Sequence, residues 1–71
     1  MTIKVGQIYS NRCKHNHIIA CVTKIKGNGK CCCINQKGTI RYCFFSDFKK
    51  YTLIAEYPTW QEAVNSKEFN K

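Results

Sequence analysis

The sequence predicts a mainly β fold: a small SH3-like five-stranded barrel followed by a short C-terminal helix. Short segments rich in β-branched and aromatic residues alternate with tight-turn signals along most of the 71 residues. A chain of this length builds only a thin core, and a strongly bent sheet that closes on itself encloses such a core without exposed edges. An OB-like barrel is the alternative that the same observations allow.

The predicted barrel contains five strands, separated by turns or by a polar loop. The Asn-Gly pair at 28–29 is a strong hairpin signal because both residues tolerate positive φ, and Gln-Lys-Gly at 36–38 indicates a second tight turn. The polar, basic segment 11–17 is typical of a loop, and 46–48 suits a single helical turn. The predicted strands cover residues 4–9, 18–26, 30–35, 39–45 and 51–57.

Near the C-terminus the apolar residues follow a helical period. Thr59 and Glu62 form a capping box, in which the threonine hydroxyl accepts a hydrogen bond from an amide of the first turn. Trp60, Ala63 and Val64 share one apolar face, so we expect this short helix to dock on the barrel as a packing lid. The chain is expected to form a single domain over 1–71, with the barrel over 1–57 and the helix and tail over 58–71.

The two central hairpins predict which side chains share a face. A two-residue turn at 28–29 pairs Lys26 with Cys31, and a three-residue loop at 36–38 pairs Cys31 with Cys43. On this register one face is a core and the other an exposed basic surface. The predicted core face holds Ile19, Cys21, Ile25, Cys32, Ile34, Ile40, Tyr42 and Phe44. The predicted basic face holds Lys24, Lys26, Cys31, Cys33, Arg41, Cys43 and Phe45.

Positive charge is concentrated in the first two thirds of the sequence. Residues 1–46 carry eight lysine or arginine side chains and no acidic one, whereas residues 47–71 carry four of each sign. The net charge of +8 therefore lies wholly in the first segment. Such a field attracts polyanions through steering and counterion release. The predicted partner is nucleic acid or the acidic surface of another protein.

The predicted basic face is the candidate binding site. Its cations suit phosphate oxygens, and an exposed ring such as Phe45 can stack on an unpaired base. The same groups suit an acidic protein patch, because arginine and aromatic residues anchor interfaces. Neither an RNA-recognition signature nor helix-turn-helix spacing is present to decide between the two partners. The candidate binding residues are Arg12, Lys14, Lys24, Lys26, Lys30, Arg41 and Phe45.

Six cysteines in 71 residues allow three interpretations: reduced structural thiols, a metal site or disulfides. Since no secretory signal is apparent, reduced thiols that act as small apolar residues are favoured, and no cofactor is expected. The alternative is a zinc site in which Cys31 joins Cys13, His15 and His17. That spacing is not a zinc-finger pattern, and ligands two residues apart on an extended strand lie too far apart for one tetrahedron.

Several classes of function are not predicted. The four acidic residues are scattered, and the sequence contains neither a Ser-His-Asp grouping nor a glycine-rich phosphate loop, so an enzyme with a small-molecule substrate is not expected. The longest uncharged apolar runs, at 18–22 and 42–45, are too short to cross a bilayer. A binding module without a membrane partner is therefore the expected class.

Three segments, KVGQIY, SDFKKYTLI and YPTWQEAVNSKEF, resemble small basic early proteins of T-even-type bacteriophages. The resemblance leaves out the cysteine-rich middle of the chain. It implies a viral protein that acts in the cytoplasm of an infected bacterial host and redirects or blocks a host system. The leading hypothesis is docking on nucleic acid or on a nucleic-acid-handling host complex. The alternatives are stoichiometric inhibition of a host defence or regulatory protein without nucleic-acid contact, and a small zinc-binding protein.

Overall fold

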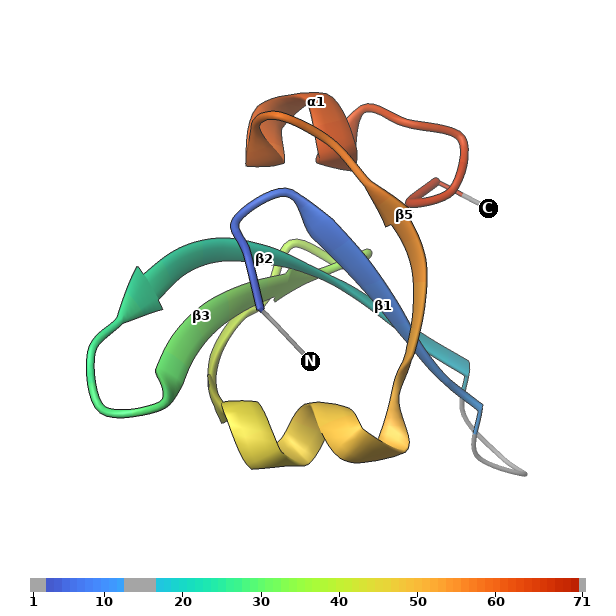
Figure 1. The fold of residues 1–71 in the computed structure, drawn as a ribbon. Coiled ribbons are helices and arrows are strands. Elements are labelled where there is room, and N and C mark those ends of the chain that lie inside the picture. The colour runs from blue at the N-terminus through green and yellow to red at the C-terminus, as the bar shows by residue number, and fades with distance from the viewer. Residues whose placement is uncertain (1–2, 13–16, 71) are drawn as a thin grey trace.

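The computed structural model describes residues 3–12 and 17–70, which form a five-stranded antiparallel sheet, a 3-10 helix and a short α-helix. Across the sheet the strands follow the order β4-β3-β2-β1-β5 (Figure 1). The predicted mainly β class with a short C-terminal helix is therefore confirmed. The elements are β1 (Gln7–Arg12), β2 (His17–Lys26), β3 (Lys30–Asn35), β4 (Ile40–Phe44), η1 (Phe45–Lys50), β5 (Thr52–Glu56) and α1 (Trp60–Val64).

The first hairpin is longer than the sequence predicts. β1 and β2 pair as far as Arg12 and His17, so strand structure extends into the segment that was expected to be a loop. Main-chain hydrogen bonds continue the ladder there, because they do not depend on apolar side chains. β1 follows a turn in which Gly6 adopts a φ of 93°. A side chain at Gly6 would collide with the carbonyl of Tyr57, so glycine is required at this close approach.

The predicted register between β3 and β4 is confirmed, whereas the predicted register between β2 and β3 is wrong. Cys31 lies opposite Cys43, as expected. In the other hairpin, Lys26 lies opposite Lys30 rather than Cys31, because the loop contains the three residues 27–29 instead of two. A β-bulge within β2 shifts the register once more. A slip of one residue moves every side chain of a strand to the other face.

One face of the sheet packs on η1 and forms an inner core. Phe48 of η1 is 1% exposed, and its ring centroid lies 4.7 Å from that of Tyr9 and 5.4 Å from that of Tyr51. Figure 1 shows η1, in yellow, on one side of the sheet and α1 on the other. The buried members of the inner core are Ile3, Tyr9, Ala20, Val22, Cys31, Cys33 and Phe48, with Cys43, Phe45 and Tyr51 packed against them.

The opposite face of the sheet is covered by α1 and the C-terminal tail over β1 and the first half of β2. Ala63 and Phe69, both buried, pack there on Ile8, Ile19 and Cys21. The hydroxyl of the N-cap residue 59 accepts a hydrogen bond from the amide of residue 62, as the capping box predicts. This second core reaches Ile34 near the end of β3 and leaves the rest of the outer side of β3 and β4 uncovered by α1 and the tail.

The predicted burial over β3 and β4 is therefore wrong for most side chains, although Cys32, expected in the core, is buried at 8% exposure. Ile40, Tyr42 and Phe44, expected in the core, are 64%, 72% and 54% exposed. Cys31 and Cys33, expected on the surface, are 0% and 2% exposed. The physical reason is that η1 follows β4 directly and folds back onto the side with the small thiols, where its large apolar ring has room. The side chains that alternate with these thiols point to the other side.

Candidate nucleic-acid interface

Lysines and aromatic rings lie together on the part of the outer side that α1 and the tail leave uncovered, over the second half of β2, β3 and β4. Alternation along β2 puts Lys24 and Lys26 on one side, and the register places Lys24 opposite Cys32 and Lys26 opposite Lys30. Cys32 in turn lies opposite Tyr42 in β4. Since directly opposed residues share a face, these side chains form one surface. The lysine–aromatic face consists of Lys24, Lys26, Lys30, Cys32, Ile40, Tyr42 and Phe44.

Each aromatic ring of this face has a lysine ammonium above it. The Nζ atom of Lys26 lies 4.6 Å from the ring centroid of Tyr42, and the Nζ atom of Lys30 lies 5.6 Å from that of Phe44. Each contact is a cation–π interaction, which contributes about 0.5–1 kcal/mol at an exposed site. Contacts of this size orient the lysines without fixing them, so the ammonium groups can exchange the ring for an anion.

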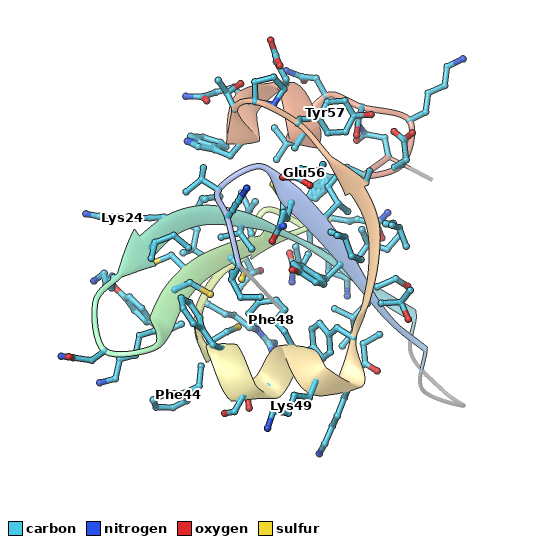
Figure 2. All side chains as sticks on the ribbon, in the orientation of Figure 1. Lys24, Phe44, Phe48, Lys49, Glu56 and Tyr57 are labelled. Atoms are coloured by element: carbon cyan, nitrogen blue, oxygen red, sulfur yellow. The ribbon has the colours of Figure 1, made fainter. Side chains whose placement is uncertain are left out.

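β4 sets the position of both rings. Tyr42 and Phe44 are two residues apart on one strand, so they project to the same side at a spacing of about 7 Å. The amide of Phe44 donates a hydrogen bond to Oδ2 of Asp47 at 3.0 Å, which fixes the end of the strand. Figure 2 shows Lys24 and Phe44 extending outward from the sheet, whereas Phe48 lies between the sheet and η1. The rings therefore stand on a rigid ladder rather than on a loop.

The charge at this face is positive. Its three lysines are exposed to solvent. Residues 17–46 include no aspartate or glutamate, and the next acid along the chain, Asp47, already accepts the hydrogen bond from the amide of Phe44. Cations that border flat aromatic surfaces are the groups that bind single-stranded nucleic acid. The lysine–aromatic face therefore presents both kinds of group, ammonium cations and exposed aromatic rings.

Known proteins give no independent indication of function. No protein-family model matches the chain, and no curated protein or solved structure is significantly similar to it. Within 3–12 and 17–70, no helix has the length and apolar character needed to cross a membrane. The chemistry of the exposed faces is therefore the basis for assigning a role.

The structure brings three of the predicted binding residues together: Lys24, Lys26 and Lys30 lie on the lysine–aromatic face. Arg41 points to the opposite side, since it pairs with Cys33 of the inner core. There it borders a hollow of about 620 Å³ whose lining also includes Lys37, Asn35 and Tyr51. The prediction that this arginine shares a face with Lys24 and Lys26 is wrong. The register between β2 and β3 differs by one residue from the predicted one, so the two lysines lie on the side of Cys32 and not on that of Cys33.

The remaining predicted binding residues are placed less favourably or lie outside the described part. Phe45 is half-buried against the inner core and is not available as a stacking platform. Arg12 ends β1, and Lys14 lies outside the described residues. Sequence reasoning missed Tyr42 and Phe44, which a two-residue turn assigns to the core. The glycine that precedes Asn-Gly at 28–29 was the available signal, because Gly-Asn-Gly also permits a three-residue loop.

Of the alternative zinc ligands, only His17 and Cys31 lie within the described residues. Cys13 and His15 lie outside the described residues, and His17 is the first residue of β2. Cys31 is fully buried, with its sulfur 3.9 Å from that of Cys33. In the part of the chain that the structure describes, no three His, Cys, Asp or Glu side chains are arranged to hold a metal ion.

Burial keeps the core thiols protonated. It raises the pKa of Cys21 from 9.0 to about 11. Burial is also the main cause that raises the pKa of Cys33, and the neighbouring Cys31 and Cys43 raise it further. The thiolate is the reactive form of cysteine, so these residues are poor nucleophiles at neutral pH. They act as small apolar side chains: Cys31 and Cys33 make room for Phe48 of η1, and Cys21 packs in the second core near Ala63 and Phe69.

Proposed function

We propose that this protein is a binding module for single-stranded nucleic acid, with the lysine–aromatic face as its interface. The observation that carries the proposal is the pair of exposed rings, Tyr42 and Phe44, on one strand bordered by three lysines. Stacking of a base on an exposed aromatic ring contributes about 1–3 kcal/mol and tolerates any base sequence. Two rings and three cations therefore support sequence-tolerant binding.

The spacing of the rings favours an unpaired strand over a duplex. Side chains two residues apart on a strand are about 7 Å apart, which is about twice the 3.4 Å rise between stacked bases. A nucleic acid that places bases on both rings must therefore unstack between them. A single strand does this at low cost, whereas a duplex must also break base pairs.

The lysines supply the electrostatic part of the proposal. Lys26 and Lys30 rest over the rings in the free protein, and phosphate groups of a bound strand offer them a stronger, fully charged partner. Their movement toward phosphates uncovers the rings for the bases. Ligand binding and ring exposure are thus coupled in this proposal.

The architecture and biological setting follow as part of the same proposal. An SH3-like arrangement of the sheet is supported by the strand order β4-β3-β2-β1-β5 and by the 3-10 helix η1 between β4 and β5. The resemblance to T-even-type early proteins supports a role in the cytoplasm of an infected bacterium. There the module would occupy nucleic acid, or a host complex that handles it, and so redirect a host system.

Fluorescence anisotropy with a labelled oligothymidine strand, and with a duplex of the same length, tests the proposal. We expect the single strand to bind more tightly, and Tyr42→Ala or Phe44→Ala to weaken its binding by at least about fivefold each, because each removes one stacking surface. Leu53→Ala, which truncates a 43% exposed side chain on β5, is the matched control and should bind like the parent. Equal affinity for duplex and single strand, or unchanged binding by both ring variants, would contradict the proposal.

A further inference from the structure

β4 is an edge strand with an open hydrogen-bonding side. It pairs with β3 and with no other element among residues 3–12 and 17–70. The amide of Phe45 donates to the carbonyl of Gly29, and the amide of Asn35 donates to the carbonyl of Thr39. Pairs 29/45 and 35/39 are thus hydrogen-bonded positions of one antiparallel register. Since such positions alternate along the ladder, odd-numbered residues of β4 bond to β3 and even-numbered ones face away from it.

The even-numbered residues therefore present their main-chain groups to the open edge. The amide of Phe44 confirms this parity, because it turns away from β3 and donates to Oδ2 of Asp47. Asp47 thereby blocks one end of the edge. Ile40 and Tyr42 are left with amide and carbonyl groups directed outward, which together make the template for one further strand.

The side chains along this edge indicate what an added strand must contain. Ile40 and Tyr42, exposed at 64% and 72%, project on the outer side, where apolar cross-strand neighbours would cover them. Arg41 projects on the inner side between them and is also exposed. The residue that an added strand places opposite Arg41 would face its guanidinium group, where a carboxylate is the favourable neighbour.

A second copy of this chain does not meet that requirement. A two-fold antiparallel pairing that uses Ile40 and Tyr42 of both copies places Arg41 directly opposite Arg41 of the other copy. Like charges in directly opposed positions destabilise a sheet. Each copy also carries a net charge of +8, so approach of the two chains is repelled over a longer range.

We propose that the open edge of β4 accepts an extended segment of another protein, in which an aspartate or glutamate is flanked by apolar residues. The added strand would bond to the main chain of Ile40 and Tyr42, place its acid against Arg41 and cover the apolar side chains of the edge. The hydrogen bonds of this interaction use main-chain groups of the edge, whereas base stacking uses side chains; the two proposals share the side chain of Tyr42.

NMR hydrogen exchange with a short capped peptide of alternating valine and glutamate tests this proposal. We expect the amides of Ile40 and Tyr42 to exchange more slowly when the peptide is present. An otherwise identical valine–lysine peptide should leave them unchanged. Arg41→Glu should reverse this preference, so that the variant binds the lysine peptide and no longer the glutamate peptide.

Two substitutions at residue 42 distinguish what its main-chain amide and what its side chain contribute to peptide affinity. Tyr42→Pro removes an outward amide that makes no bond to β3, so the sheet should keep its fold while peptide affinity falls at least about tenfold. Tyr42→Ala keeps the amide and should retain most of the peptide affinity, although it weakens nucleic-acid binding. Unchanged thermal unfolding and slow exchange at the amides of Cys31 and Cys33 report that the fold is intact.

Three results would overturn the proposal. These are peptide binding that leaves exchange at Ile40 and Tyr42 unchanged, full affinity in the Tyr42→Pro variant, and slow exchange of the edge amides in a concentration-dependent dimer without peptide. The last result would assign the edge to a second copy of the chain. None of the three bears on oligothymidine binding, so this proposal and the proposed function fail independently.

Discussion

At the scale of single residues, burial keeps three cysteine side chains in their neutral thiol form. Cys21, Cys31 and Cys33 are each no more than 2% exposed, and burial raises the pKa of all three thiols. Neutral thiols are small apolar groups, which suits a core this thin. Their position in the core also makes stability sensitive to alkaline pH, since a buried thiolate is unfavourable.

The residue-scale prediction concerns Cys21. Its pKa is about 11 in the folded protein against 9.0 for an unperturbed thiol, so between these values the unfolded chain releases a proton that the folded chain keeps. The free energy of unfolding therefore falls as the pH rises from about 9 to about 11, by no more than about 3 kcal/mol from this thiol. Urea titrations across this range should show a shallower decline for Cys21→Ala than for the parent. Parallel declines would show that Cys21 does not contribute.

At the scale of elements, η1 decides which face of β4 is buried. The helix begins directly after β4 and anchors its one buried residue, Phe48, against Tyr9 and Tyr51. Its two lysines, Lys49 and Lys50, remain exposed on the solvent side. A single aromatic anchor thus holds the inner core and leaves the opposite face of the hairpin free.

The element-scale prediction compares two phenylalanines that lie four residues apart. Phe48→Ala should lower the free energy of unfolding by about 3–5 kcal/mol, because it removes a fully buried ring. Phe44→Ala removes a 54% exposed ring and should cost about 1 kcal/mol or less, mainly through the lost contact with Lys30. Urea unfolding followed by circular dichroism measures both values. Similar costs for the two variants would show that the faces of β4 are assigned wrongly.

At the scale of the whole molecule, cations lie on both sides of the sheet, and among residues 3–12 and 17–70 one side combines them with the exposed rings of Tyr42 and Phe44. Lys24, Lys26 and Lys30 border Tyr42 and Phe44. On the other side, the cations include Arg41, Lys37 beside it at the hollow, and the two lysines of η1. The total charge of +8 alone would attract a polyanion to either side. Binding at one defined face requires in addition that the lysines lie beside the exposed rings.

The whole-molecule prediction uses two triple variants of equal charge. Lys24→Gln, Lys26→Gln and Lys30→Gln together should reduce the salt dependence of oligothymidine binding by about two units of slope, because each lost phosphate contact contributes about 0.7. The control joins Arg41→Gln, Lys49→Gln and Lys50→Gln on the other side of the sheet. It should keep the slope of the parent. An equal reduction in both variants would indicate a diffuse field without a defined face.

The sequence by itself determined the elements and one of the two central registers. The three-residue loop at 36–38 fixed Cys31 opposite Cys43, and the capping residues fixed the start of α1, because turns and caps are local interactions between near neighbours. Charge, together with the predicted basic face, placed Lys24, Lys26 and Lys30 among the binding candidates.

Only the tertiary structure decided which face of β3 and β4 is inside, and with it which residues form the proposed interface. The segment offers small thiols on one side and Tyr42 and Phe44 on the other, and apolar patterning favours burial of the larger residues. Long-range contacts reverse that choice: Phe48 fills the space above Cys31 and Cys33, and a three-residue loop with a bulge in β2 carries the lysines to the rings. A difference of one residue in a loop reverses both faces of a sheet, since side chains alternate with a period of two. Local sequence signals permit either loop, and the packing of the whole core selects one.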